Sequence, residues 1–407
     1  MNFLKLIKNV SKKKIILFIK IYLIISFIFY NITSIFYFFI THINFENEII
    51  KIEMYFKYCN NIKIQKFNKI KNPRVSIISP IYNREKFIKR FIGSIQNQNF
   101  KDIEIIFVDD NSVDNSVNLI EKYKKKEKRI ILIKNKKNKG TFVARNLGVL
   151  LSKAKYVIIP DPDDIISKEI VRICYKYGEK YNYDIIRFNS YIGRGKIVNE
   201  DFAKFKKNRA VYHPELSTYI YYGNNELEII DNFINNKFIK RKVYIESLNS
   251  LNNFYLNMYM TFMEDSLMNH LLHRTAKSFY FIKNIGYKYK KTSESITKKL
   301  FIISELKLKF TFIYMKFIFE FSKNTKYEKD MFNLRLTHMN KNFDIQKYLS
   351  KINYNKNFYF YYKVINMIAN CLYISDENMN LLNKLKNIIE KKKELKKLDK
   401  IKNSIIS

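Results

Sequence analysis

Three aspartates crowd into four residues where a short apolar run ends. The run Tyr156–Ile159 is typical of a β-strand, and Asp161, Asp163 and Asp164 follow it. So many negative charges in one turn are costly unless a cation binds among them. Carboxylate oxygens suit Mg²⁺ or Mn²⁺, and a nucleotide diphosphate could complete the coordination of a metal held by one or two of them. The pattern favours a divalent-metal site over a solvated turn.

A second acidic pair, Asp109 and Asp110, follows the strand-like run 103–108, and Ser112 comes shortly after it. In an open sheet of parallel strands, ligands bind beyond the carboxyl ends of the strands, which is where this pair would lie. Acidic and hydroxyl residues are also ordinary turn formers and helix caps. The pair alone therefore allows either a binding or a capping role.

A third acidic pair, Glu264 and Asp265, stands at the start of a helical pattern. A carboxylate in this place could take a proton from a hydroxyl nucleophile, although first-turn acids are also favoured by the helix dipole. Between Asp110 and Asp161, Arg145 lies in a predicted helix that begins near Gly140. Its guanidinium could reach a diphosphate or form a surface ion pair.

The segments around these residues alternate between strand and helix patterns. An apolar run starts at Val75 and is broken by Pro80, and further strand-like runs occupy 103–108, 130–133 and 156–159. Between the first two runs, one apolar stripe at helical spacing is formed by Phe87, Ile88, Phe91, Ile92 and Ile95. The alternation predicts an α/β domain with a parallel sheet.

Four segments, taken in order, resemble the family 2 glycosyltransferases: Ser79–Asn83, Val108–Ser112, Asn138–Asn146 and Asp161–Asp164. The resemblance extends over about residues 73–300. It implies a GT-A, Rossmann-like α/β fold and an inverting transfer from a nucleotide-diphospho-sugar, a UDP-sugar being favoured. A carbohydrate or glycoconjugate is the implied acceptor. The rival hypothesis is an inactive GT-A-like protein that binds nucleotide or glycan.

The resemblance also assigns roles to single residues. Asp163 corresponds to the direct metal ligand of the DxD motif, and Asp164 is expected to cap the next helix. Asp265 is the implied general base, and Glu264 orients the acceptor or Asp265. Many relatives have glycine where this chain has Met263. The implied nucleotide-sugar contacts are Pro80, Tyr82, Asn83, Asp110, Ser112, Arg145 and Asp161.

The composition excludes several other classes of protein. The 407 residues carry a formal net charge of +38, but the lysines are spread along the chain, so nucleic acid is not an expected partner. A hydrophobic fraction of 47% suffices for a core. Cys59, Cys174 and Cys371 stand far apart, which predicts free thiols rather than a zinc site or disulfides.

Residues 21–40 contain no charged side chain and match the length that crosses a bilayer as a helix. Lysines precede this segment and glutamates follow it, which favours a cytosolic N-terminus. We therefore expect a retained signal-anchor; in a eukaryote this means a type II protein of the Golgi or endoplasmic reticulum. Against a lumenal catalytic domain, the Asn-x-Ser/Thr triplets occur only at Asn9 and Asn31.

The expected organisation follows from these features. A GT-A domain lies between an N-terminal transmembrane helix and a C-terminal extension that is helical by its periodicity. The predicted segments are a basic tail (1–14), the anchor (15–40), a stem (41–72), a nucleotide-sugar half (73–195), an acceptor half (196–300) and the extension (301–407).

Overall fold

The chain separates into two compact units, Met1–Cys59 and Asn60–Ser407. The computed structural model describes parts of the second unit: residues 72–192, 196–198, 210–212, 233–290, 304–320, 349, 361–362, 364–365, 368 and 376–406. The predicted anchor and all but the last residue of the predicted stem lie outside the described residues. Across the described ranges, no helix is both long and apolar enough to cross a membrane.

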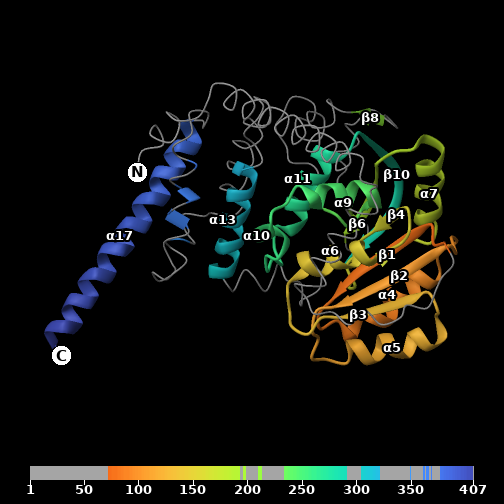
Figure 1. Cartoon of the computed structure of the whole chain (residues 1–407), viewed down its shortest axis with the longest axis horizontal. Helices are drawn as coiled ribbons and strands as arrows, with labels where there is room; N and C mark the ends of the chain where they lie inside the picture. Colours follow the sequence, from red (N-terminus) through yellow and green to blue (C-terminus); the bar gives the residue numbers. More distant parts are fainter. Residues whose placement is uncertain are drawn as a thin grey trace, which may run out of the picture. The chain divides into compact units, whose positions relative to one another are not determined.

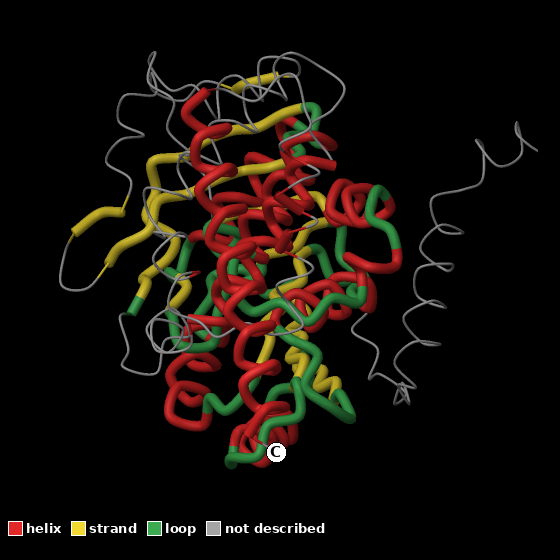
Figure 2. Tube along the Cα trace, turned by 90° about the vertical axis from the view of Figure 1, so that its left-hand side faces the viewer, coloured by secondary structure: helices red, strands yellow, loops and turns green. Residues whose placement is uncertain are grey.

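A mixed sheet of ten strands forms the centre of the α/β domain (Figure 1). Its strands are β1 (Val75–Ile81), β2 (Ile103–Asp109), β3 (Ile130–Lys134), β4 (Tyr156–Ile158), β5 (Ile165–Ile166), β6 (Ile185–Ile192), β7 (Lys196–Val198), β8 (Ala210–Tyr212), β9 (Lys237–Lys240) and β10 (Ser278–Tyr289). They lie in the order β3-β2-β1-β4-β9-β6-β10-β5, with β7 beside β6 and β8 beside β10. The sheet is twisted, and the yellow strands of Figure 2 do not share one direction.

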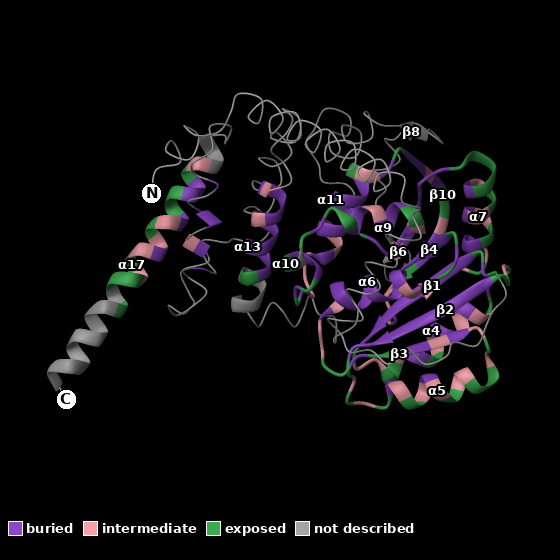
Figure 3. Ribbon diagram, in the orientation of Figure 1, coloured by how far each residue is buried: buried purple, intermediate pink, exposed green. Residues whose placement is uncertain are grey.

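The helices alternate with the strands in the first half of the domain. Along the whole described part of the chain, the helices are α4 (Glu85–Gln96), α5 (Ser116–Lys126), α6 (Thr141–Leu151), α7 (Ile170–Tyr181), α9 (Arg241–Asn249), α10 (Asn253–Leu256), α11 (Glu264–Thr275), α13 (Ser304–Glu320) and α17 (Asp376–Ile406). Figure 3 shows the central strands buried, while α5 and α7 keep exposed outer faces. The apolar stripe predicted for α4 is confirmed, since four of its five members are buried.

The predicted parallel sheet is confirmed only in its first half. Strands β3, β2, β1 and β4 are parallel neighbours. Strand β9 then runs antiparallel to both β4 and β6, so the whole sheet is mixed. An antiparallel neighbour, unlike a parallel one, needs no crossover helix.

The expected break at Pro80 is wrong, because β1 continues to Ile81. Pro80 pairs in register with Val108 of β2, whereas β4 accompanies β1 only from Val75 to Ile77. The missing N–H of Pro80 therefore lies beyond the stretch that β4 pairs with, and no ladder bond is lost on that side. The extra length carries β1 to the rim of the site.

Helix α6 packs closely on the first two strands. A Cβ on Gly148 would collide with the side chain of Ile78 and crowd that of Val108. This close approach at a glycine fixes α6, with Arg145 on it, against the sheet.

The C-terminal extension is helical wherever it is described, as α13 and α17. Phe317 of α13 meets Tyr255 of α10 and His270 of α11 edge-to-face. Cys174 is a buried free thiol in α7, as the sequence predicts.

Candidate active site

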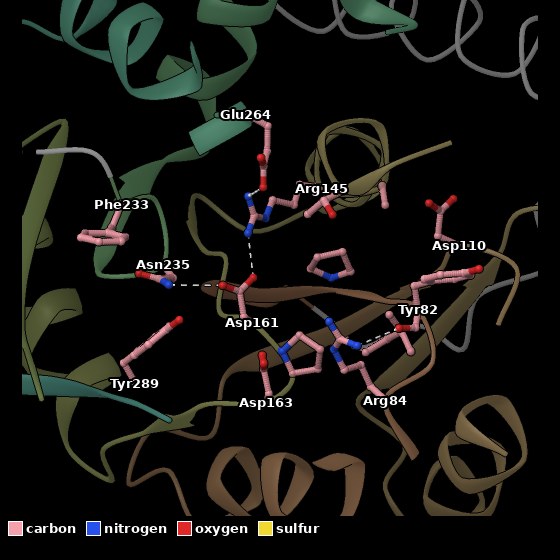
Figure 4. A pocket seen from close by; sticks show the side chains of 15 residues that line it. Tyr82, Arg84, Asp110, Arg145, Asp161, Asp163, Phe233, Asn235, Glu264 and Tyr289 are labelled. Carbon is pink, nitrogen blue, oxygen red and sulfur yellow. Dashed lines mark hydrogen bonds and ion pairs between the residues drawn. The ribbon is translucent and has the colours of Figure 1, made fainter. Parts of the chain in front are cut away.

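A pocket opens beyond the carboxyl ends of β1, β2 and β4, at the edge of the sheet where the sequence places it (Figure 4). Figure 4 shows Tyr82 and Asp110 on one side of Asp161, and Phe233, Asn235 and Tyr289 on the other. Its lining residues are Pro80, Ile81, Tyr82, Arg84, Asp110, Thr141, Ala144, Arg145, Asp161, Pro162, Asp163, Phe233, Asn235, Glu264 and Tyr289.

Arg145 lies at the centre of a buried cluster of charged side chains. Its Nη2 lies 2.7 Å from Oδ1 of Asp161, and its Nη1 lies 3.2 Å from Oε1 of Glu264. The same Nη1 pairs with Oδ1 of Asp265. Only 6% of the Arg145 side chain is exposed, so the alternative of a surface ion pair is excluded. One guanidinium faces three carboxylates, which leaves the cluster with an excess of acid.

That excess is visible in the acid–base properties of the pair at the start of α11. Burial, and then the charge of Asp265, raise the pKa of Glu264 to about 8. Burial also raises the pKa of Asp265, although the charge of Arg145 opposes it. Glu264 lines the pocket, whereas Asp265 is not among the lining residues. A carboxylate with a raised pKa is a better proton acceptor, provided that it is ionised.

Met263 immediately precedes this pair in a left-handed conformation, with φ 65° and ψ 3°. A positive φ is strained for most residues that carry a Cβ, whereas glycine adopts it freely. The conformation gives a physical reason for the glycine that many relatives have at this place.

Asp161 joins the cluster to the far side of the pocket. Its Oδ1 accepts a hydrogen bond from Arg145, and its Oδ2 accepts one from Nδ2 of Asn235 at 3.3 Å. Because both oxygens are engaged, Arg145 and Asn235 hold this carboxylate in place.

Asp163 carries the carboxylate of the turn that is available to a ligand. Burial, and then the charge of Asp161, raise its pKa, while Arg84 and Arg90 act in the opposite direction. Nη2 of Arg90 donates to the backbone carbonyl of Asp163 at 2.6 Å and so fixes the turn. No side chain among the described residues forms an ion pair with this carboxylate within 4.0 Å.

Asp164 does not cap the next helix, so that prediction is wrong. Its carboxylate accepts from the hydroxyl of Tyr287 and from the backbone N–H of Lys290 at 2.8 Å. Glu169 occupies the N-cap of α7 instead. Burial, and then the charges of Asp161 and Asp163, raise the pKa of Asp164 to about 8.

At the other end of the pocket, Asp110 organises a loop. Its carboxylate accepts from Asn135 and from the backbone N–H groups of Lys139 and Gly140, all between 2.8 and 3.1 Å. Gly140 has φ 90°, and a Cβ there would lie 2.8 Å from the backbone nitrogen of Met260. Asp110 thus ties the start of α6 to the end of β2, and Gly140 lets the segment before α11 approach closely.

Asn83 and Ser112 join the β1 and β2 loops but do not line the pocket. The backbone N–H of Asn83 donates to Oγ of Ser112 at 3.0 Å, and Oδ1 of Asn83 accepts from the N–H of Val113 at 2.9 Å. Asp109 closes the same turn by accepting from the N–H of Ser112. Pro80 and the exposed ring of Tyr82 line the pocket and can contact a ligand.

Four residues that line the pocket lie outside the four segments and the acidic pair described in the sequence analysis: Arg84, Phe233, Asn235 and Tyr289. Nη1 of Arg84 donates to the backbone carbonyls of Tyr82 and Asn83. Phe233 and Asn235 precede β9, whose antiparallel return to β4 brings them beside Asp161. Their place beside Asp161 depends on this antiparallel return and not on a local pattern in the sequence.

Residues 76–248 match the family model described as glycosyl transferase family 2. This match covers 173 of the 407 residues, and the domain is similar to that family. The resemblance first seen in the sequence is thereby confirmed.

Two bacterial relatives illustrate the similarity. The chain is 35% identical over 162 residues to the poly(ribitol-phosphate) beta-N-acetylglucosaminyltransferase TarP of Staphylococcus aureus, a match covering 38% of this chain and 48% of TarP. It is 28% identical over 226 residues to the uncharacterized glycosyltransferase EpsJ of Bacillus subtilis, covering 56% of this chain and 63% of EpsJ. The chain thus spans less than two thirds of the length of either relative.

The fold is similar to that of residues 1–349 of S. aureus TarS, whose crystal structure contains UDP-GlcNAc. The TM-score is 0.59 at 17% identity, and the match covers 78% of this chain and 89% of TarS 1–349. The GT-A-like α/β fold inferred from the sequence is therefore confirmed.

The described residues can supply part of the coordination of a divalent cation. They contain no group of three or more His, Cys, Asp or Glu side chains arranged to hold a metal ion. Asp163 with Asp161 can supply one or two hard oxygen ligands, and the Asp163 carboxylate lines the pocket. Such a set suits a cation that completes its coordination with a diphosphate.

Proposed function

We propose that this protein transfers a sugar from a nucleotide-diphospho-sugar to a hydroxyl group of a carbohydrate acceptor, with inversion at the sugar carbon. The observation that carries the proposal is the convergence of Asp161, Glu264 and Asp265 on Arg145, a residue that lines the pocket. The strand-end turn and the helix start come together there although they are far apart in the sequence. A domain that served only as a scaffold has no need of this costly cluster.

The nucleotide is assigned to the side of the pocket that Pro80, Tyr82 and Asp110 line. The exposed ring of Tyr82 offers a stacking face, and Arg84 fixes the backbone around it. Asn83 and Ser112 contribute by holding the two loops together. We favour a uridine diphosphate sugar, because the structurally similar TarS has been crystallised with UDP-GlcNAc.

The diphosphate is assigned to the middle of the pocket, near Asp161, Asp163 and Arg145. Asp163 is the proposed direct ligand of Mn²⁺ or Mg²⁺, with Asp161 nearer the sugar. When bound, the cation would offset the charge that develops on the leaving diphosphate. Arg145 adds a fixed positive charge in the same place, where it needs no reorganisation during the reaction.

Asp265 is the proposed general base. The acceptor hydroxyl gives its proton to the carboxylate while its oxygen forms a bond to the anomeric carbon. The bond from that carbon to the diphosphate oxygen breaks, and the nucleoside diphosphate leaves with the electron pair. Attack from the face opposite the leaving group inverts the configuration. Glu264, which lines the pocket, is assigned to orienting the acceptor or Asp265.

The test is release of nucleoside diphosphate by the full chain in detergent, supplied with UDP- and GDP-sugars and Mn²⁺. Asp265→Asn is expected to lower turnover at least about 10²-fold while it still binds UDP, because only proton removal is lost. Glu246→Gln, at an exposed position of α9, serves as the control. Unchanged turnover of Asp265→Asn would remove its assigned role, and donor binding without any turnover in the wild type would favour the inactive binding protein.

We further propose that residues 15–40 anchor the protein in a membrane as a single-pass helix, with residues 1–14 in the cytosol. The uncharged stretch 21–40 and the lysines before it support this. In a eukaryotic cell, the catalytic domain would face the lumen of the endoplasmic reticulum or Golgi. Extraction of the protein by alkaline carbonate would contradict the anchor, and protease protection of the C-terminus in sealed vesicles tests the orientation.

A further inference from the structure

A buried tyrosine sits directly behind the Asp161–Asp164 turn. Tyr287 lies on β10 with 1% of its surface exposed. Its hydroxyl accepts a hydrogen bond from the backbone N–H of Asp161 at 3.1 Å and donates one to the carboxylate of Asp164. One hydroxyl therefore holds both ends of the turn, with Asp163 between them.

The same network reaches the wall of the pocket. Asp164, itself 1% exposed, uses its second oxygen to accept from the N–H of Lys290 at 2.8 Å. Lys290 directly follows Tyr289, which lines the pocket. Strand β5 pairs with β10 at Tyr287, so the chain leaving the turn is also attached to this strand. The turn and the pocket wall are thus parts of one connected unit.

We propose that Tyr287 is a positioning residue of the transfer reaction: through its hydroxyl and Asp164 it sets the Asp161–Asp163 turn and the Tyr289 wall in one geometry. The proposal rests on the proposed function, in which this turn receives the cation and the diphosphate. Tyr287 touches neither ligand, since it is absent from the pocket lining. It acts through the carboxylates that it holds.

The physical argument concerns the two groups that the Tyr287 hydroxyl contacts. Removing the hydroxyl leaves the N–H of Asp161 without its acceptor and one oxygen of Asp164 without its donor. A fully satisfied buried network specifies one geometry, whereas a partly satisfied one relaxes toward others. Groups behind metal ligands commonly change metal affinity by about 10- to 100-fold when they are altered.

The first test needs no ligand. Tyr287→Phe keeps the buried ring and removes only the hydroxyl, and Tyr255→Phe is its matched control. Tyr255 is also fully buried and its hydroxyl also donates to a carboxylate, that of Glu320 on α13. In hydrogen–deuterium exchange of the full chain, Tyr287→Phe is expected to speed exchange at least about tenfold in the peptide 159–166, and Tyr255→Phe is expected to leave that peptide unchanged.

The second test measures UDP binding against Mn²⁺ concentration by calorimetry. Tyr287→Phe is expected to raise the Mn²⁺ concentration for half-maximal UDP affinity about tenfold, and Tyr255→Phe to leave it unchanged. Asp164→Asn, combined with Tyr287→Phe, is expected to add little, because both act in one network. Unchanged exchange at 159–166, or unchanged Mn²⁺ dependence with faster exchange, would overturn the proposal. A wild type that binds no UDP would instead defeat the proposed function, and the exchange result would stand apart from it.

Discussion

The two sides of the pocket are built in different ways. Around Asp110, Asn83 and Ser112, each carboxylate, amide or hydroxyl oxygen accepts from backbone N–H groups, and the loops are fixed before any ligand arrives. Around Arg145, three carboxylates share one guanidinium. The first side is shaped by hydrogen bonds that satisfy each other, while the second keeps an excess of negative charge.

This difference indicates how the work is divided. A loop held by backbone N–H groups offers shape, which suits recognition of a nucleotide. A cluster with raised pKa values on Glu264, Asp265 and Asp163 is suited to a cation and to proton transfer. The comparison therefore predicts that changes on the first side weaken nucleotide binding with or without a cation, while changes on the second alter stability, pH dependence, turnover and the cation-dependent part of binding.

The largest effect is expected from Arg145→Met. It would leave three carboxylates in a buried site without their cation and destabilise the fold by about 3–5 kcal/mol. The loss should shrink as the pH falls, because protonation neutralises the carboxylates. Denaturant unfolding at two pH values measures both effects. Arg172→Met, which removes an exposed ion pair with Glu169, is the control and should change the free energy of unfolding by less than about 1 kcal/mol.

The next effect concerns the pH dependence of stability. The pKa of Glu264 is about 8 in the folded chain, above its ordinary value of 4.5, so the folded state holds this proton more tightly than the unfolded state. The resulting stability is present below pH 4.5 and is lost as the pH rises toward 8. Glu264→Gln should flatten the fall in unfolding free energy over this range. An equally steep fall in the variant would show that Glu264 is not its source.

A smaller effect is expected on the nucleotide side. Asp110→Asn removes an acceptor from the N–H groups of Lys139 and Gly140 and should loosen the start of α6. UDP affinity is expected to fall about tenfold, a loss of roughly 1.4 kcal/mol. Calorimetric titration with UDP checks this. Asp114→Asn, whose exposed carboxylate accepts from the N–H of Glu85, serves as the comparison.

The sequence was informative where signals are local. The strand ends that carry Asp110 and Asp163 follow from apolar runs that stop at acidic residues, and α4 follows from its stripe. The ion pairs of Arg145 with Glu264 and Asp265 join residues 119 and 120 positions apart, and nothing local in either segment encodes them. For the same reason Asp164 resembled a helix cap, although its partner Tyr287 lies 123 positions away.

Backbone conformation also escaped sequence reasoning. Methionine at position 263 gives no indication of a positive φ, because residues other than glycine seldom adopt one. The antiparallel strand β9 was equally hard to foresee, since its four residues carry no pattern that sets a direction. The order along the chain of the segments that line the candidate site could be predicted, but the contacts between these segments could be seen only in the three-dimensional structure.

The most direct test of this division is a UDP titration of the wild type and of Asp163→Asn, each with and without Mn²⁺. The account predicts that the wild type binds UDP weakly without the cation and at least about tenfold more tightly with it, whereas Asp163→Asn keeps only the weak binding. Equal Mn²⁺ enhancement in both proteins would contradict it, because the cation would then be bound without the carboxylate that the structure leaves facing the pocket.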